Sequence, residues 1–298
     1  MIVSVSRRTD IPAFYSDWFY NRIKEGYVDV LNPFNTKQAN RIMLTKDNVE
    51  CFVFWTKNPK PMMKRLNELN GYNYYFQFTL NSYSTDLEPN VPNKSKELIA
   101  TFIELSNMIG KEKVIWRYDP IILTDKYTLE WHVKYFRLLA EKLHNHTEKC
   151  VISFLDLYKK TTSNMKNIKL TPITTYEMNY LAEKFSEICQ EYGLVLATCC
   201  EEIDLEKYGI KHNKCIDDEL IERISGKKVL NTKRDNQRSS CGCIKCSDIG
   251  VYNTCQHNCR YCYASFNNHV ISENVKKHDE NSSLLLGRLE EDVKLYLK

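Results

Sequence analysis

Short β-branched or aromatic runs alternate along this chain with longer amphipathic segments, and this alternation limits the folds that the chain can adopt. The runs predict strands at Ile2–Val5, Val28–Val30, Glu50–Trp55, Tyr74–Leu80, Val114–Arg117, Val151–Phe154, Leu194–Thr198 and Asp248–Tyr252. The amphipathic segments predict helices at Ser16–Glu25, Pro59–Leu69, Ser95–Ile109, Leu129–Leu143 and Thr174–Tyr192. Such alternation is typical of a parallel sheet covered by helices. With about eight such units we predict an α/β fold, a closed or nearly closed TIM-like β/α barrel, with an open doubly wound sheet as the competing architecture.

The composition of the chain suggests where its parts divide. Residues 1–225 carry most of the alternating pattern and form the expected barrel body. Residues 226–240 are rich in Lys, Arg, Asn and Ser, which is typical of a polar connector. Residues 241–298 form a cysteine-rich segment that we expect to complete the barrel and to end in an amphipathic helix, Leu284–Leu297.

Overall composition narrows the class of protein. Of 298 residues, 43% are hydrophobic and 27% are charged, which is typical of a soluble globular protein. The formal net charge of +4 is too small to argue for a nucleic-acid partner. No apolar run approaches the roughly 20 residues that a membrane span needs, and the amino terminus becomes charged at Arg7 before a signal-peptide core could form. We therefore expect a cytoplasmic protein without a membrane partner.

Polar residues gather where the predicted strands end. In a parallel barrel the carboxyl ends of the strands and the loops after them form the active-site face. The candidates on this rim are Arg7, Arg8, Asp10, Lys57, Asn58, Gln77, Arg117 and Asp119. Taken singly, each could be a loop charge or a helix cap, and Arg117 with Asp119 could be a simple ion pair.

Three cysteines near the carboxyl end have a spacing that suits a metal. Cys255, Cys259 and Cys262 have three and then two residues between them, so one tight loop can offer three thiolates. Three thiolates can bind three irons of a [4Fe-4S] cluster and leave the fourth iron open to a small molecule. A structural zinc site would normally be closed by a fourth ligand. Unligated thiols remain the third alternative.

This loop resembles the cluster loop of the radical SAM superfamily. The match rests on the three cysteines and on Tyr261, which stands at the aromatic position before the last of them. The resemblance implies that S-adenosylmethionine occupies the open iron and that Tyr261 contacts the cofactor. It implies a 5′-deoxyadenosyl radical that attacks a substrate, and an electron donor such as flavodoxin or ferredoxin. The substrate, small or macromolecular, stays unidentified.

The remaining cysteines could form a second site. The preferred ligand set is Cys199, Cys215, Cys241 and Cys243, with Cys200 and Cys246 as alternates. The radical SAM resemblance implies a second [4Fe-4S] cluster here, because many of those enzymes hold one. A structural zinc site is the rival, and ordinary thiols are the other alternative.

The whole chain resembles an uncharacterised bacterial domain-of-unknown-function family whose radical-SAM-like cysteines lie at the carboxyl end. The resemblance rests on Ser-Arg-Arg-Thr-Asp-Ile-Pro, Phe-Trp-Thr-Lys-Asn-Pro, Trp-Arg-Tyr-Asp-Pro and Asp-Ile-Gly-Val-Tyr-Asn-Thr-Cys. In the superfamily the cluster loop usually follows the first barrel strand, whereas here it follows the last. A circular permutation would reconcile the two, since the last strand of a barrel lies beside the first.

Two other functional classes stay open. The protein could be a non-catalytic zinc or iron–sulfur protein. It could also be a barrel enzyme with a structural metal and conventional acid–base chemistry by Asp119, Glu88 or His132. The Tyr-Cys-Tyr-Ala ending of the loop is similar to the spore photoproduct lyase group, but the nearly neutral charge argues against DNA as the substrate.

Overall fold

The computed structural model describes residues 1–156, 159–235, 241–265 and 267–298. Its centre is an eight-stranded sheet in the order β11-β10-β8-β6-β5-β4-β1-β12, in which every neighbouring pair is parallel. The strands are β1 Ile2–Val5, β4 Cys51–Thr56, β5 Tyr74–Thr79, β6 Val114–Ile121, β8 Lys149–Phe154, β10 Val195–Thr198, β11 Lys211–His212 and β12 Ser247–Asp248. The chain therefore has the predicted α/β class.

The strand order carries information about the architecture. From β1 to β11, each strand of this sheet lies beside the strand of the same sheet that follows it in the sequence. The sheet therefore lacks the reversal of strand order that defines a doubly wound sheet. The late strand β12 then joins at the other edge, where Val3 of β1 pairs with Ser247. The last strand thus lies beside the first, as expected. Among the described residues β11 and β12 do not pair with each other, so the hydrogen-bonded order stays open.

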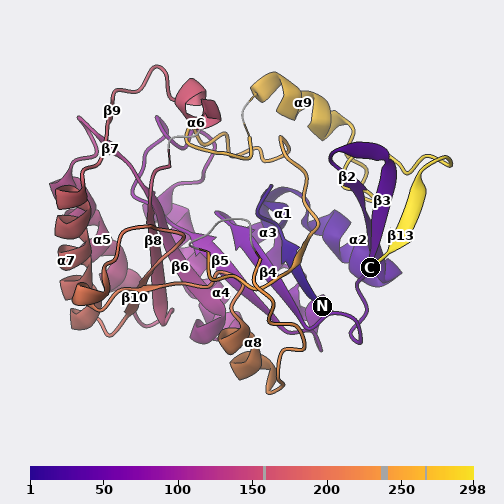
Figure 1. Cartoon of the computed structure of the whole chain (residues 1–298), viewed down its shortest axis with the longest axis horizontal. Helices are drawn as coiled ribbons and strands as arrows, with labels where there is room; N and C mark the ends of the chain where they lie inside the picture. Colours follow the sequence, from indigo (N-terminus) through magenta and orange to yellow (C-terminus); the bar gives the residue numbers. More distant parts are fainter. Residues whose placement is uncertain (157–158, 236–240, 266) are drawn as a thin grey trace.

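Most helices cover one face of this sheet, whereas α8 packs against the other face (Figure 1). The helices of the described residues are α1 Ile11–Phe14, α2 Ser16–Glu25, α3 Lys60–Met63, α4 Ile99–Ile109, α5 Leu129–Leu143, α6 Lys159–Asn164, α7 Thr175–Glu191, α8 Asp218–Ser225 and α9 Asn268–Lys276. Short helical turns lie at Leu66–Leu69, Lys94–Leu98, Lys111–Lys113 and Glu206–Tyr208. Helix α7 begins with the predicted capping box between Thr174 and Glu177. No helix of the described residues has the length and apolarity needed to cross a bilayer.

Alternation along the strands divides the core into two parts. On the helix-covered face, aromatic side chains dominate, and Phe136 of α5 stacks on Phe185 of α7 with ring centroids 3.9 Å apart. On the other face, Val53, Tyr75 and Ile115 pack against the segment that contains α8. Because successive side chains of a strand point to opposite faces, the same strands also send polar side chains to this second face, nearer their carboxyl ends.

Of two sequence predictions for smaller elements, one is confirmed and one is wrong. Val28–Val30 lies in a strand as predicted, but this strand, β2 Tyr27–Asn32, pairs antiparallel with β3 Asn35–Met43 in a separate small sheet. Leu284–Leu297 is not a helix. It bends at Gly287, whose φ of +70° favours glycine, and ends in β13 Lys294–Leu297, which pairs parallel with β3 at the right of Figure 1.

Contacts with helix α2 explain why Leu284–Leu297 is not a helix. Trp18 donates its indole N–H to the carbonyl oxygens of Ser282 and Leu284, at 2.9 and 3.1 Å. Leu284 and Leu285 are both buried in this segment. Tertiary contacts therefore decide the local structure here.

Other boundaries differ less. The predicted helix Pro59–Leu69 divides into α3 and a helical turn, and the predicted strand Asp248–Tyr252 shortens to the two residues of β12. The predicted connector 226–240 is described only as far as Asp235, because 236–240 lie outside the described residues. The small antiparallel pair of β7 Leu123–Thr124 and β9 Leu170–Thr171 lies beyond the large sheet.

Candidate functional site

A cavity of about 380 Å³ lies at the carboxyl ends of the central strands. Thr79 of β5, Arg117 of β6 and Ser153 of β8 line it, together with the residues that follow β1 and β4. Most of the predicted rim residues are among its lining: Arg7, Arg8, Asp10, Lys57, Arg117 and Asp119. Eight cysteines line the same cavity: Cys199, Cys200, Cys215, Cys241, Cys243, Cys255, Cys259 and Cys262. The fold thus gathers both predicted cysteine groups and most of the rim at one place.

The loop of Cys255, Cys259 and Cys262 follows β12 at one side of this cavity. Asn258 has a φ of +58°, a left-handed conformation that Asn tolerates, and it lets the loop turn between its first two cysteines. The three thiols lie close enough that Cys262 and Cys259 add to the effect of burial in raising the pKa of Cys255. Among the described residues no hydrogen bond joins one of these thiols to another. The three thiols are nevertheless close neighbours in one loop.

Asp10 holds this loop against the strand ends. One of its carboxylate oxygens accepts hydrogen bonds from His257 Nε2 at 2.8 Å and from the backbone N–H of Lys57 at 2.7 Å. The other caps helix α1 by accepting from the N–H of Ala13. Asp10 and His257 are both buried. A single carboxylate thus joins the end of β1, the end of β4 and the cysteine loop.

Lys57 places a positive charge beside the loop. Its ammonium donates to Glu88 at 2.8 Å and to the hydroxyl of Tyr261 at 2.9 Å, and Tyr261 itself donates to Glu88. Burial alone would raise the pKa of Glu88, but the ammonium groups of Lys57 and Lys94 hold it at about 2. Burial raises the pKa of Cys259, and Lys57 opposes that rise. The charge of Lys57 therefore favours thiolate in the loop.

Arg117 connects the cavity wall to the second cysteine group. Its guanidinium forms an ion pair with Asp119 and donates to the sulfur of Cys215 at 2.9 Å. Gln77 lies beneath it, accepts from Arg117 at 3.3 Å and donates to the carbonyl of Cys215 at 3.0 Å. The alternative of an ion pair between Arg117 and Asp119 is therefore correct, and the pair also lies in the cavity wall.

The second cysteine group comes from three segments of the chain. Cys199 and Cys200 follow β10, Cys215 follows β11, and Cys241 and Cys243 precede β12. The sulfurs of Cys199 and Cys215 are 3.3 Å apart. Cys200, followed by Cys243, lowers the pKa of Cys241 to about 3 through thiol hydrogen bonds. The alternate Cys246 lies outside this group and accepts a hydrogen bond from Arg7 at 3.1 Å.

Asp248 is a further organising residue that the sequence reasoning missed. Its carboxylate accepts hydrogen bonds from the hydroxyls of Ser4 and Ser6 and from the N–H of Arg7, at 2.6 to 2.8 Å. It thereby fixes β12 to the start of the chain. It begins the predicted strand Asp248–Tyr252, so its position at the start of the strand did not indicate a rim residue.

Several predicted or alternative residues do not line the cavity, among them Asn58, Gln77 and His132. Asn58 accepts from the N–H of Lys60 at 3.3 Å, so it caps the turn into α3. Gln77 is buried below the cavity wall. His132 is fully buried between Tyr118 and the carbonyl of Ile122, at 2.8 and 3.0 Å, and burial lowers its pKa to about 4.

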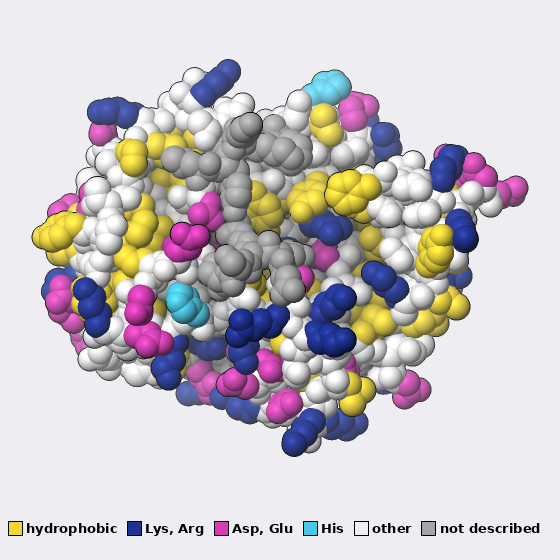
Figure 2. Space-filling view, viewed as in Figure 1, with side chains coloured by type: hydrophobic (Ala, Val, Ile, Leu, Met, Phe, Trp, Pro, Cys, Tyr) yellow, Lys and Arg dark blue, Asp and Glu magenta, His cyan; other side chains and the backbone are white. Residues whose placement is uncertain are grey.

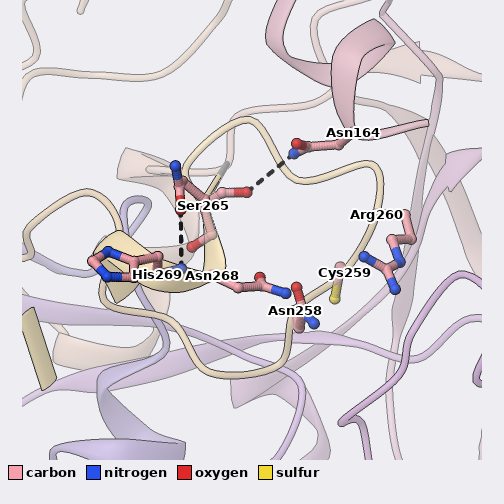
Figure 3. Close-up of a pocket in the computed structure, with 8 residues that line it drawn as sticks. Asn164, Asn258, Cys259, Arg260, Ser265, Asn268 and His269 are labelled. Atoms are coloured by element: carbon pink, nitrogen blue, oxygen red, sulfur yellow. Dashed lines mark hydrogen bonds between the residues drawn. The ribbon is translucent and has the colours of Figure 1, made fainter. Parts of the chain in front are cut away.

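A smaller pocket of about 220 Å³ lies behind the cysteine loop (Figure 3). Asn164 of α6 donates across it to the carbonyl of Ser265 at 3.3 Å. Cys259 lines both this pocket and the larger cavity, so the middle of the loop forms the wall between them.

Two observations bear on metals and on charge. Within the described residues, no group of three or more His, Cys, Asp or Glu side chains has the geometry of a formed metal site. On the face drawn in Figure 2, Lys and Arg side chains are interspersed with Asp and Glu. That pattern offers no argument for a nucleic-acid surface on this face.

Comparison with known proteins gives a family and little else. No curated protein matches the chain. A crystal structure from Bacteroides thetaiotaomicron VPI-5482, provisionally assigned as an alpha-L-fucosidase, matches with 11% sequence identity over 61% of this chain and 73% of that chain. Its TM-score of 0.26 is too low to support an inference about fold or function.

The family match covers nearly the whole chain. The sequence model described as "Domain of unknown function (DUF1848)" matches residues 2–264, which include the rim residues and both cysteine groups. The chain therefore belongs to the DUF1848 family of unknown function.

Proposed function

We propose that this protein is a radical-SAM-like enzyme in which Cys255, Cys259 and Cys262 hold a [4Fe-4S] cluster. The observation that supports it most is that these three thiols share one cavity with the charged residues at the strand ends. A cavity of about 380 Å³ lies in the range of roughly 300–1,000 Å³ that is usual for small-molecule sites. With the loop beside β1, the proposal also takes the sheet as a permuted β/α barrel.

The donor set fits such a cluster. Three thiolates would leave one iron open toward the cavity, where S-adenosylmethionine would bind. Thr9 and Thr161 line the cavity with buried hydroxyls that find no hydrogen-bond partner among the described residues. Buried hydroxyls are rarely left unsatisfied, so these two are suited to contact a polar ligand.

The chain's own residues would then position the cofactors. Asp10 and His257 fix the loop, and Lys57 balances part of the negative charge that three thiolates bring. The hydroxyl of Tyr261 hydrogen-bonds with Lys57 and Glu88, and these contacts fix the orientation of the loop. Arg7, Arg8 and Arg117 supply positive charge for the carboxylate of a ligand.

Once bound, the cluster and S-adenosylmethionine would supply radical chemistry that takes a hydrogen atom from the substrate, with one electron from a donor such as flavodoxin or ferredoxin. The alternative of acid–base chemistry has less support, because His132 lies outside the cavity lining and Glu88 is held ionised by two lysines.

The test is anaerobic purification followed by reduction with dithionite in the presence of S-adenosylmethionine. We expect a brown protein that forms 5′-deoxyadenosine. The variants Cys255→Ala, Cys259→Ala and Cys262→Ala should each abolish that product, while Cys51→Ala, a buried cysteine of β4, should retain it. Colourless protein without iron after anaerobic reconstitution would refute the proposal.

A further inference from the structure

The second cysteine group forms a closed ring of thiol contacts. Cys199 contacts Cys215 at 3.3 Å, and Cys215 has a further thiol hydrogen bond with Cys243. Cys243 and Cys200 both hydrogen-bond with Cys241, and Cys200 closes the ring with Cys199. Five thiols from three chain segments therefore lie next to one another and line the same cavity.

Nitrogen donors point at two of these sulfurs. Cys215 accepts from Arg117 Nη1 at 2.9 Å and from Asn213 Nδ2 at 3.4 Å. Cys243 accepts from the backbone N–H groups of Cys215 and Ile216, at 3.2 and 3.4 Å. N–H donors stabilise a thiolate and a metal-bound thiolate alike. A group of thiols kept only for packing would not need four such donors.

The spacing of the sulfurs favours a single ion. Zn–S bonds of about 2.3 Å at tetrahedral angles place the ligand sulfurs about 3.8 Å apart. The 3.3 Å between Cys199 and Cys215 is close to that value. Ligand sulfurs of a cubic cluster lie farther apart. The short contact between Cys199 and Cys215 therefore fits one ion better than a cluster.

The ring also contains cysteines from segments next to both edge strands of the sheet. Cys215 follows the edge strand β11, and Cys243 precedes the opposite edge strand β12. Among the described residues, a single backbone hydrogen bond joins these two segments, from the N–H of Ile244 to the carbonyl of Ile216 at 3.2 Å. A metal bound by both segments would join the two edges of the open sheet.

We propose that Cys199, Cys215, Cys241 and Cys243 bind one zinc ion that joins these two edges, with Cys200 as the neighbouring fifth thiol. On binding, the four thiols release four protons to solvent and four Zn–S bonds form, leaving a net charge of −2. Arg117 lies against this site and offsets part of that charge. The zinc site is independent of the cluster proposed for the 255–262 loop.

Metal analysis of three variants tests the proposal. Wild-type protein, purified anaerobically without chelators, should contain about one zinc per chain. The variant Cys215→Ser/Cys243→Ser should lose the zinc and keep the iron of the other loop. The variant Cys255→Ser/Cys259→Ser/Cys262→Ser should lose the iron and keep the zinc. The matched control Cys246→Ser, which changes a cysteine outside the ring, should keep both metals.

A second measurement covers variants that fail to fold. Wild-type protein in which Co²⁺ replaces zinc should show the thiolate-to-metal absorption of a tetrahedral four-sulfur site. Chelation of the zinc should lower the melting temperature, and added Zn²⁺ should restore it. Absence of zinc from wild type, its retention in Cys215→Ser/Cys243→Ser, or loss of iron in that variant would each overturn the inference. Loss of iron only in the triplet variant would leave the proposed function intact.

Discussion

The side chains of Asp10 and His257 lie 247 residues apart in the sequence, yet they meet at 2.8 Å in the interior. This contact joins the first strand to the loop that carries Cys255 and Cys259. The same carboxylate oxygen also accepts the N–H of Lys57. Two elements from opposite ends of the chain thus form one site, so the position of the loop depends on the first ten residues.

Replacing Asp10 should therefore destabilise the position of the 255–262 loop. Asp10→Ala removes three hydrogen bonds, two of them from part-buried backbone N–H groups and one from the buried His257. We expect a loss of about 2–4 kcal/mol of unfolding free energy, measured by urea denaturation. The control Asp17→Ala removes an exposed ion pair with Arg65 and should cost less than about 1 kcal/mol. Equal losses in the two variants would contradict this role for Asp10.

The buried contact between Lys57 and Glu88 gives a coupling prediction. Lys57→Met leaves Glu88 with only Lys94 to balance it, so we expect a loss of about 3 kcal/mol. Adding Glu88→Gln should recover part of that loss, because the remaining amide carries no charge. A double-mutant cycle by denaturation measures the coupling. Strictly additive losses would show that the pair is not coupled.

His132 predicts a pH dependence of stability. Its pKa in the folded protein is about 4, below the unfolded value of about 6.5, so the unfolded chain binds more protons between these values. Stability from this group is complete above pH 6.5 and falls as the pH drops toward 4, by on the order of 3 kcal/mol. His132→Gln should flatten the unfolding free energy across this window relative to wild type. An unchanged pH profile in the variant would refute the assignment.

Gly250 should tolerate no side chain. A Cβ there would lie 2.0 Å from the hydroxyl oxygen and 2.6 Å from the Cβ of Ser6, so either β1 or the cysteine segment must shift. We expect Gly250→Ala to cost about 2 kcal/mol or more in urea denaturation. Gly242→Ala is the matched control, since its Cβ first meets the flexible side chain of Lys214 at 3.2 Å. A larger loss in the control would be inconsistent with this packing.

The sequence predicted the large elements well, because their periodicity reflects burial. The strands around Phe52, Phe76 and Trp116 and the long helices α5 and α7 lie where the pattern indicated. The pattern failed where tertiary contacts decide, as in the segment that Trp18 holds at Leu284. Val28 lies in a strand as expected, but its antiparallel partner could not be foreseen from the sequence alone.

The sequence indicated which residues belong to the site, but it did not indicate which of them contact one another. Arg117 and Lys57 stand out because charged residues follow apolar strands, and both line the cavity. The part played by His257 could not be predicted, because its partner Asp10 lies at the other end of the chain. Gln77 shares a face with the cavity residues, yet its depth along the strand depends on register and buries it.

Iron content tests the central proposal most directly. Wild-type protein, reconstituted anaerobically with iron and sulfide, should hold about four irons per chain that depend on Cys255, Cys259 and Cys262. The triple variant of these cysteines to serine should lose those four irons, since no other described group shares their spacing. Equal iron content in wild type and the triple variant would contradict the account.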